Sequence, residues 1–378
     1  MTLGILAPNI KSGGGLTHLI ELLNAVYPQK HGFNKVIVWS NNNTLNKLPD
    51  KKWLFKKTHP YLNKSSFHTF YWMFFISKNE AEQENCNLIF VPGGTYIGRF
   101  RPYVTMSRNM LPFEWSEASR FNSFKKKLRY LFLHFTQLYT FKRATGLIFL
   151  SNYAKDKIAP LLGKASPFLK TIPHGINNSF FIYPRHQKSV NNYSNDNPLK
   201  ILYVSIINFY KHQWVISEAI AILRKKEIPV SLELIGPSYL PALNKLKTKL
   251  KELDPDENFI RYIGVIPYNE LPSKYANADI GVFASSCETF GQILTEKMSA
   301  GLPIACSNRS AMPELLGNAG LYFDPENSQE IATALEKLIN DPELRQKKAT
   351  EAHEKAKHFT WEKCAYETFQ FLSKIANQ

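Results

Sequence analysis

Residues 3–39, LGILAPNIKSGGGLTHLIELLNAVYPQKHGFNKVIVW, decide the fold class of the first half of this chain. A short apolar run over 3–8 is followed by a loop that contains three consecutive glycines. Leucine and isoleucine then recur at helical spacing over 16–26, and a second apolar run covers 36–39. A strand, a glycine loop, a helix and a second strand in this order are typical of the opening of a doubly wound α/β domain.

The same alternation continues through the chain. More parallel strands are predicted in the first half at 87–92, 146–150 and 170–173. A second α/β series is predicted from residue 199 onward, with strands at 199–204, 231–235, 259–263, 280–283 and 303–306 and helices at 213–225, 240–253, 269–277 and 291–300. The pattern predicts two Rossmann-like, doubly wound α/β domains in tandem, with no repeat of solenoid period.

The domain boundary is expected in a polar, asparagine-rich stretch, RHQKSVNNYSNDNP. Such turn-forming segments are typical of interdomain linkers. We therefore expect a first domain over 1–184, a linker over 185–198 and a second domain over 199–360. A final helix over 361–378 is expected to pack back toward the first domain.

The net charge of +16 belongs entirely to the first half of the chain. Residues 1–178 hold 24 basic and 8 acidic side chains, whereas the remaining 200 residues hold 23 of each. This asymmetry indicates an anionic partner for the first half, such as nucleic acid, an acidic membrane surface or a phosphorylated substrate. No nucleic-acid recognition motif with interleaved aromatic residues accompanies the charge, so we expect no nucleic-acid partner.

Several other classes of protein are disfavoured. Four scattered cysteines do not suggest a disulfide framework or a zinc cage, and a reducing compartment is the simplest assumption. The first residues lack the pattern of a signal peptide, and no run of about 18 apolar residues indicates a spanning helix. The pair Asp254 and Asp256 lies in a turn-forming stretch, and we expect a loop there and no metal site. The chain is expected to be cytoplasmic.

The stretch CETFGQILTE, residues 287–296, carries two glutamates around a Phe-Gly pair. A strand is predicted to end near residue 283 and a helix to begin at Gly291, so the backbone N–H groups of Thr289, Phe290 and Gly291 would attract a diphosphate. Gln292 is expected at the same donor site. Glu296 lies within the helix, where its carboxylate would accept the hydroxyls of a ribose or remain a solvated surface group. Glycosidase carboxyl pairs are about 5 Å or about 6.5–9.5 Å apart. Glu288 and Glu296 are expected to lie about 10 Å or more apart, since a helix rises about 1.5 Å per residue, which favours separate roles.

This pattern, with Ala300-Gly301-Leu302-Pro303 and Met312-Pro313-Glu314-Leu315 after it, resembles the donor site of family 4 retaining glycosyltransferases (glycosyl transferases group 1). The resemblance implies the GT-B fold, in which two Rossmann-like domains face each other across a cleft. It also implies that Glu288 contacts the transferred sugar or supports developing positive charge, and that Glu296 holds the ribose of a nucleotide diphosphate sugar. No cofactor and no metal are implied.

Other donor-binding residues are expected after the first two strands of the second domain, where a topological switch point collects ligands. Lys211 matches the lysine that clasps the diphosphate in similar enzymes. Ile206 stands where those enzymes carry an arginine, so Asn208 is expected to help bind phosphate. Gly236, directly after the second strand, is also expected at the donor.

The first domain contributes a second set of candidates. Gly14 and Gly15 resemble the glycine loop that faces the donor phosphates in the family, although a tight turn without a ligand is equally compatible with them. Arg108 and Asn109 occupy the place of a histidine that contacts the transferred sugar in many relatives. They are expected to bind phosphate and a sugar hydroxyl, or else to form a structural turn before Pro112. His174 resembles part of the hinge motif and is expected to be structural or to line the cleft.

Residues 124–144, FKKKLRYLFLHFTQLYTFKRA, predict a helix with a basic start and an apolar face. Lys125, Lys126, Lys127 and Arg129 are expected to contact anionic lipid headgroups at the inner face of the cytoplasmic membrane. A helix packed in the core with a solvated basic end is the alternative.

These features together predict transfer of a hexose-type sugar from a nucleotide diphosphate sugar to a glycan or lipid-linked acceptor, with retention of configuration. Synthesis of a bacterial surface polysaccharide or lipopolysaccharide is the expected setting. A non-catalytic nucleotide-sugar binder and a GT-B nucleotide-sugar epimerase are the alternatives.

Overall fold

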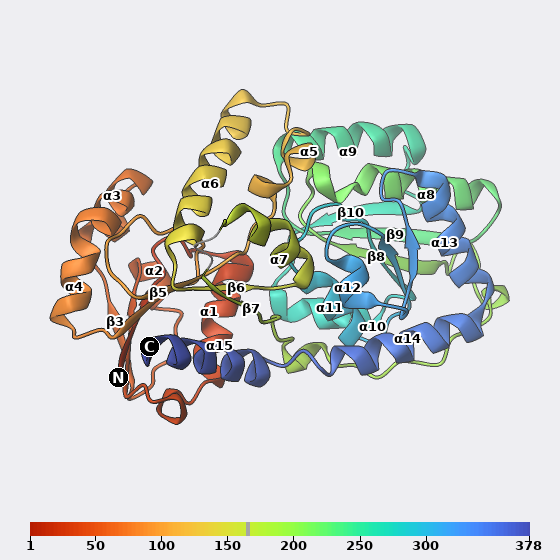
Figure 1. Ribbon diagram of the computed structural model, residues 1–378. Helices are drawn as coiled ribbons and strands as arrows, with labels where there is room; N and C mark the ends of the chain where they lie inside the picture. The colour runs from red at the N-terminus through yellow and green to blue at the C-terminus, as the bar shows by residue number, and fades with distance from the viewer. Residues whose placement is uncertain (164–166) are drawn as a thin grey trace. The chain divides into compact units, whose positions relative to one another are not determined.

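The computed structural model describes residues 1–163 and 167–378, which form two compact units (Figure 1). Unit 1 comprises Met1–Ala118, Ser123–Gly175 and Thr360–Gln378. Unit 2 comprises Ser119–Asn122 and Ile176–Phe359. The final helix α15 (Trp361–Ala376) is therefore part of unit 1.

Residues 185–198 lie within unit 2, where the sequence predicted a separate linker. Arg185 donates through Nη2 to Oδ1 of Asp279 at 2.5 Å, and the Tyr193 hydroxyl donates to the same oxygen at 2.8 Å. The polar composition thus belongs to a stretch that is fastened to unit 2 by side-chain hydrogen bonds. The boundary falls between Gly175 and Ile176 and not after residue 184.

Unit 1 is built on a parallel sheet of seven strands in the order β3-β2-β1-β4-β5-β6-β7. The strands are β1 (Thr2–Leu6), β2 (Lys35–Trp39), β3 (Leu54–Lys57), β4 (Leu88–Val91), β5 (Tyr103–Met106), β6 (Gly146–Phe149) and β7 (Phe168–Thr171). Besides α15, its α-helices are α1 (Gly13–Ala25), α2 (Asn42–Leu45), α3 (Ser66–Tyr71), α4 (Ser77–Gln83), α5 (Trp115–Ala118), α6 (Phe124–Arg143) and α7 (Asn152–Ile158). A π-helical segment, η3 (Trp72–Ile76), connects α3 to α4. The predicted strands of this half are present, and β3 and β5 are additional.

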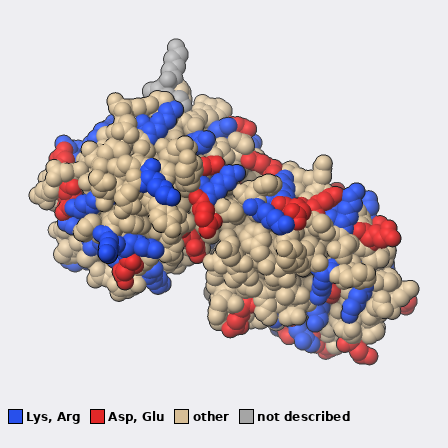
Figure 2. All heavy atoms as spheres, turned by 90° about the horizontal axis from the view of Figure 1, so that it is seen from below, with Lys and Arg blue, Asp and Glu red and all other residues tan. Residues whose placement is uncertain are grey.

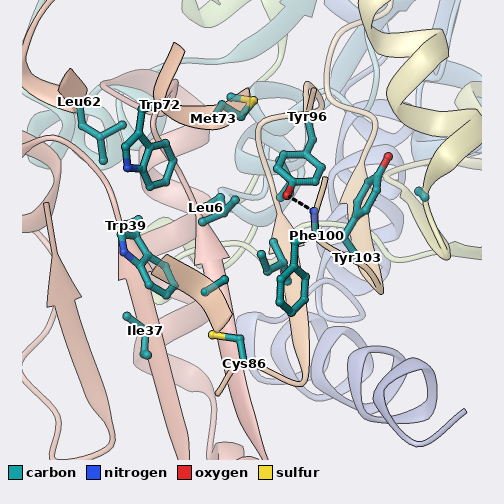
Figure 3. Packing of buried hydrophobic residues seen from close by; sticks show 14 residues of the cluster. Leu6, Ile37, Trp39, Leu62, Trp72, Met73, Cys86, Tyr96, Phe100 and Tyr103 are labelled. Atoms are coloured by element: carbon teal, nitrogen blue, oxygen red, sulfur yellow. Dashed lines mark hydrogen bonds between the residues drawn. The ribbon is translucent and has the colours of Figure 1, made fainter. Parts of the chain in front are cut away.

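Large aromatic side chains fill one part of the core of unit 1 (Figure 3). Trp39 from β2 and Trp72 from η3 are almost completely buried there, together with Tyr96 and Tyr103. The backbone N–H of Phe100 donates to the Tyr96 hydroxyl at 3.2 Å, so that buried oxygen has a partner. The sheet of unit 1 is thus packed against a dense apolar layer.

Unit 2 is built on a parallel sheet of six strands in the order β10-β9-β8-β11-β12-β13. The strands are β8 (Leu199–Val204), β9 (Val230–Ile235), β10 (Ile260–Gly264), β11 (Ile280–Phe283), β12 (Ile304–Ser307) and β13 (Leu321–Phe323). Its α-helices are α8 (Gln213–Lys225), α9 (Leu240–Leu253), α10 (Leu271–Ala276), α11 (Gln292–Ser299), α12 (Met312–Leu316), α13 (Ser328–Asn340) and α14 (Pro342–Ala356). Two tandem parallel-sheet domains of this kind confirm the predicted GT-B fold class.

The strand order places a topological switch point in unit 2 between β8 and β11. The chain runs outward from β8 through β9 to β10 and then returns to the other side of β8. At such a point the loops after two neighbouring strands diverge and leave a crevice at their carboxyl ends. Here these are the loop that leads to η8 (Phe209–Lys211) and the loop between β11 and α11.

Candidate functional site

The two loops at the switch point of unit 2 are joined by hydrogen bonds. The backbone N–H of Ser286 donates to the carbonyl of Tyr210 at 2.9 Å. Two residues after Tyr210, His212 Nε2 lies 2.8 Å from the Ser286 hydroxyl. The topology therefore brings together Lys211 and Glu288, which are 77 residues apart in the sequence.

Lys211 and Glu288 form an ion pair in which the lysine Nζ donates to the carboxylate. Both side chains are largely shielded, since 8% of Lys211 and 18% of Glu288 is exposed. The ammonium also lies 5.2 Å from the centre of the Tyr210 ring and 5.1 Å from that of Phe283. The sequence predicted that these two residues bind different parts of one substrate, and the structure places them in direct contact.

The backbone of Glu288 is fixed by Ser310, a residue that the sequence analysis did not single out. The Ser310 hydroxyl accepts from the Glu288 N–H at 2.8 Å and donates to the Glu288 carbonyl at 2.7 Å. Ser310 itself has a positive φ of 61°, an uncommon conformation for a residue other than glycine. This contact spans 22 residues, so no local pattern in the sequence indicates it.

The loop continues through Phe290 into the start of α11. The Phe290 ring is buried and lies edge-on to Phe359, with 5.8 Å between ring centres, so its side chain is used in packing. Gly291 precedes the helix with a φ of 107°, and a Cβ there would lie 2.6 Å from Cε of Met312. Only glycine fits this turn, which places Gln292 as the first residue of the helix. The positive end of the α11 dipole is thereby directed at the loop that carries Glu288.

Glu296 is buried just over one turn inside α11, as the fifth residue of the helix. Its carboxylate accepts from the Tyr268 hydroxyl at 3.0 Å and from the Tyr275 hydroxyl at 3.3 Å. Burial raises the pKa of Glu296 to about 7, although both tyrosine hydrogen bonds act in the opposite direction. The alternative of a solvated surface carboxylate is therefore wrong. The two tyrosines lie 21 and 28 residues from Glu296, and the sequence analysis did not single them out.

The two other expected donor-binding residues of unit 2 shape the same loops. The Asn208 side chain accepts from the backbone N–H of Phe209 at 2.9 Å and so caps η8. Gly236 has a φ of 143°, and a Cβ there would lie 2.2 Å from the carbonyl oxygen of Ser205. The loops after β8 and β9 approach so closely that only glycine is accommodated.

Unit 1 holds the remaining predicted residues as a second group. Gly14 and Gly15 are in the first turn of α1, which begins at Gly13, and not in a separate loop. Nη2 of Arg108 donates to the Gly14 carbonyl at 2.7 Å, and burial lowers the pKa of the Arg108 guanidinium to about 10. The structure thus joins Arg108 to the glycines of α1.

Asn109 has a structural role in this conformation. Its side-chain oxygen accepts from the backbone N–H of Leu111 at 3.1 Å, which closes the turn before Pro112. His174 is buried as well and stacks on His18 of α1, with 4.7 Å between ring centres. These contacts match the structural alternative for Asn109 and the structural role expected of His174.

The predicted helix with the basic start is α6, and its N-cap is Ser123, whose hydroxyl accepts from the Lys126 N–H at 3.4 Å. Lys125 and Arg129 are exposed, and Lys126 and Lys127 are half-buried. The apolar face of α6 is also exposed, with exposed fractions of 53% for Phe132 and 62% for Phe135. The alternative of a helix with its apolar face in the core is therefore wrong.

On the face of the molecule that Figure 2 shows, basic and acidic side chains alternate with wide uncharged areas. The excess positive charge therefore does not form one continuous patch on that face. Within 1–163 and 167–378, no helix has the length and apolar character needed to cross a membrane.

The carboxylate of Asp254 is hydrogen-bonded within its own loop. It accepts from the backbone N–H groups of Asn258, Phe259 and Ile260 at 2.7–2.9 Å. Among the described residues, no group of three or more His, Cys, Asp or Glu side chains is arranged to hold a metal ion. The four cysteines are buried, and no disulfide joins any of them in the part of the chain that the structure describes.

Comparison with known proteins identifies the domain that carries this site. Residues 185–355 match the family model described as glycosyl transferases group 1. Among curated proteins, O-antigen chain mannosyltransferase B of Escherichia coli is 37% identical over 120 residues, which are 32% of this chain and 32% of that protein. The D-inositol 3-phosphate glycosyltransferase of Corynebacterium glutamicum is 28% identical over 166 residues, which are 43% and 40% of the two chains. The chain thus spans only 32% and 40% of the length of these two relatives.

Solved structures match the whole chain at low sequence identity. Anabaena HepE in complex with UDP and glucose has a TM-score of 0.71 at 17% identity, over 99% of both chains. Sucrose-phosphate synthase from Thermosynechococcus elongatus has a TM-score of 0.76 at 17% identity, over 99% of this chain and 98% of that one. WaaG, a glycosyltransferase involved in lipopolysaccharide biosynthesis, has a TM-score of 0.69 at 15% identity, over 98% and 99%. These likenesses establish the fold of both units.

Proposed function

Because residues 185–355 match the family model described as glycosyl transferases group 1, we propose that the chain transfers a hexose-type sugar from a nucleotide diphosphate sugar to a hydroxyl group. The observation that carries this proposal is the arrangement around α11. An ion pair between Lys211 and Glu288 lies at the start of the helix, and a buried carboxylate, Glu296, lies just over one turn inside it. This order of groups matches the order of sugar, diphosphate and ribose in such a donor.

Each group has a distinct part in the proposed reaction. Lys211 and the positive end of α11 would stabilise the negative charge that develops on the leaving diphosphate, which is the kind of electrostatic contribution usually largest in enzymes. Glu288 would orient the sugar and offset the positive charge of an oxocarbenium-like transition state. Glu296 would accept the ribose hydroxyls. Arg108 and Asn109 of unit 1 remain the candidates for contacts to phosphate and sugar.

We propose retention of configuration, with the acceptor hydroxyl attacking from the face that the diphosphate leaves. Among the candidate groups, the carboxylate next to the expected sugar site is Glu288, and it is already paired with Lys211. A double displacement through an enzyme nucleophile is therefore not proposed. The positive charge comes from Lys211 and α11, so we expect activity to persist in the presence of EDTA.

The proposed acceptor is a glycan or a lipid-linked oligosaccharide of a bacterial surface polysaccharide. Similarity to an O-antigen chain mannosyltransferase and to WaaG, a glycosyltransferase involved in lipopolysaccharide biosynthesis, supports this choice. The exposed apolar face of α6 supports an acceptor that is presented at a membrane.

A panel of nucleotide sugars tests the proposal. We expect one donor to raise the thermal midpoint, because a ligand present at about 100 times its Kd stabilises the folded state by about 2.7 kcal/mol. With that donor, free nucleoside diphosphate should be released only when an acceptor hydroxyl is added. Release without any acceptor, with epimerised sugar as the product, would identify an epimerase. Binding without turnover on every acceptor would identify a non-catalytic binder.

We further propose that α6 attaches unit 1 to an anionic membrane surface. The helix presents Phe124, Phe132 and Phe135 to solvent directly beside the cations at its start. The Phe132 ring also lies 6.3 Å from that of Phe70 in α3, where Phe67 is 76% exposed. Exposed aromatic residues next to lysine and arginine are typical of helices that lie in the headgroup region of a bilayer.

Sedimentation with vesicles tests this attachment. Wild-type protein should sediment with vesicles that contain phosphatidylglycerol and less with vesicles of phosphatidylcholine alone. Replacing Phe132 and Phe135 with Ser should weaken sedimentation without lowering the thermal midpoint, since both side chains are exposed. Leu240→Ser in unit 2, at a position that is 65% exposed, is the matched control. Equal sedimentation of the double variant and the wild type would contradict the proposal.

A further inference from the structure

Lys297, the residue after the proposed ribose ligand, is completely buried. Its Nζ has no hydrogen-bond partner among the described residues. A buried ammonium group without a partner is strongly unfavourable, and natural proteins rarely keep one without a function. Lys297 is therefore an unusual feature of this domain, and the reaction proposed above does not use it.

Three aromatic rings and a glycine surround the long side chain of Lys297. Its Nζ lies 5.6 Å from the centre of the Tyr203 ring, 5.8 Å from that of Tyr275 and 5.0 Å from that of Phe283. Gly281 of β11 leaves room for the aliphatic part, since a Cβ at that position would lie 3.0 Å from Cδ of the lysine. The faces of aromatic rings stabilise a cation only moderately, so the amine is well accommodated both with and without its proton.

The aromatic rings around Lys297 also connect it to the donor site. Lys211 lies 5.1 Å from the centre of the Phe283 ring, so the two amines contact one ring. The Tyr275 ring beside Lys297 carries the hydroxyl that donates to Glu296. Neighbouring residues on a helix do not face each other, and no hydrogen bond joins Lys297 to Glu296 among the described contacts. Their interaction is therefore electrostatic.

We propose that Lys297 is a positioning residue of the donor site, and that it takes up the proton that Glu296 gives up when a ribose binds. In the free protein the two buried groups share one proton, and a ribose diol requires the carboxylate form of Glu296. Binding breaks the O–H bond of the carboxyl group, and the proton forms an N–H bond on the amine. The proton moves within the pair, so the total charge of the pair does not change. This inference rests on the proposed function of Glu296 as a ribose ligand.

The pKa values are consistent with a shared proton. Burial lowers the pKa of Lys297 to about 7 and raises that of Glu296 to about 7. Lys297 favours the carboxylate form of Glu296, and Glu296 favours the ammonium form of Lys297. The other titratable groups that face this pair are Tyr203 of β8, Lys211 of η8, Tyr268 of η9 (Tyr268–Glu270), Tyr275 of α10, Glu288 and Cys306 of β12.

Calorimetric titration with UDP, GDP and ADP between pH 6 and pH 9 tests the inference. For the wild type, the affinity of the tightest of these ligands should be nearly constant from pH 6 to pH 8, and almost no proton should be released to the buffer. Lys297→Met keeps the length of the side chain but cannot accept the proton. In this variant the affinity at pH 7 should fall about tenfold, since a single nearby charge shifts a pKa by about one unit or more.

The affinity of Lys297→Met should recover by pH 9, and about one proton should be released on binding at pH 7. Glu296→Gln is the control, because the change at Lys297 should then have no further effect on the pH dependence. If Lys297→Met binds equally weakly at every pH, Lys297 only fills space. If its affinity depends on pH in the same way as that of the wild type, the inference is also overturned. If none of the three nucleotides binds the wild type, the proposed function fails together with it.

Discussion

Lys211 and Glu288 form their ion pair in the absence of any ligand, so the proposed leaving-group cation and the proposed sugar ligand hold each other in place. Such a pair orients both side chains before a donor arrives. It also means that removal of either residue disturbs the other, because a half-buried charge loses its partner.

Lys211→Met and Glu288→Gln should each lower kcat about 100- to 1000-fold, the usual effect of removing one preorganised electrostatic group. The measurement is steady-state turnover with the donor found in the nucleotide-sugar panel. Lys274→Met is the matched control, because Lys274 forms a more exposed ion pair with Glu233 at 3.1 Å in the same unit. Turnover near the wild-type level in either site variant would remove that residue from the mechanism.

His212 provides a test of stability against pH. It is buried with a φ of 51° between η8 and α8, and burial lowers its pKa from 6.5 to about 4. The unfolded chain then binds more protons than the folded one between these values, so stability is lost as the pH falls from 6.5 toward 4. The shift corresponds to a loss of about 3 kcal/mol at pH 4.

The variant for this test is His212→Asn, because asparagine tolerates a positive φ and does not titrate. We expect the denaturation free energy of the variant to depend less on pH than that of the wild type between pH 4 and 6.5. The difference between the two proteins isolates His212 from all other titrating groups. If the denaturation free energies of the two proteins change with pH in parallel, His212 keeps an ordinary pKa in the folded state.

At the scale of elements, the carboxyl ends of the strands in unit 2 are shaped by close backbone approach. The loop after β9 contacts the loop after β8, where Gly236 approaches the carbonyl oxygen of Ser205. This contact positions the segment from Ser205 to Lys211, which carries the proposed phosphate ligands. A glycine that the sequence assigned to ligand binding thus has a clear role in the backbone.

Gly236→Ala should destabilise the protein by about 2 kcal/mol or more, since the new Cβ would lie 2.2 Å from a backbone oxygen. Gly264→Ala is the matched control in the neighbouring strand, because its φ is 85° and a Cβ there would have no atom within 4 Å. Chemical denaturation of both variants separates the cost of the close approach from the cost of a positive φ. Equal losses in the two variants would contradict this account of Gly236.

The elements of unit 2 could be predicted well from the sequence. Helices α8 and α9 and strands β8 and β11 have the predicted bounds, because apolar residues recur there with a clear period. Strands β3, β5 and β13 were not predicted. Their sequences, LFKK, YVTM and LYF, lack the run of Leu, Ile and Val that marks equally short strands such as β4, LIFV.

At the scale of the whole molecule, the charge asymmetry leads to a prediction about salt. All of the excess of +16 lies in residues 1–178, and most of unit 1 is built from this part. Raising the salt from 0.1 M to 1 M shortens the Debye length from about 10 Å to about 3 Å. Binding to phosphatidylglycerol vesicles should therefore fall steeply in 1 M NaCl, whereas the contribution of the exposed phenylalanines of α6 should remain.

Sedimentation with vesicles at both salt concentrations measures the two contributions. Replacing Lys125, Lys126 and Lys127 together with Gln should weaken binding at 0.1 M NaCl and have little effect at 1 M. Vesicles of phosphatidylcholine alone serve as the reference without surface charge. Binding that is independent of salt would contradict a role for the basic start of α6.

The sequence by itself determined the alternation of strands and helices, the two tandem parallel-sheet units and the position of the candidate donor loop before α11. These features depend on local periodicity and on residues that are close together in the chain, such as Glu288, Gly291 and Glu296. The family resemblance has the same origin, since its motif lies within one strand–loop–helix segment.

Only the tertiary structure decided which side chains surround those residues. Ser310 holds the backbone of Glu288, Tyr268 and Tyr275 hold Glu296, and Lys297 is buried beside them. The structure also placed residues 185–198 within unit 2 and turned the apolar face of α6 toward solvent. All of these facts depend on which distant segments cover a given side chain, and that coverage is a property of the packed fold and not of any local pattern.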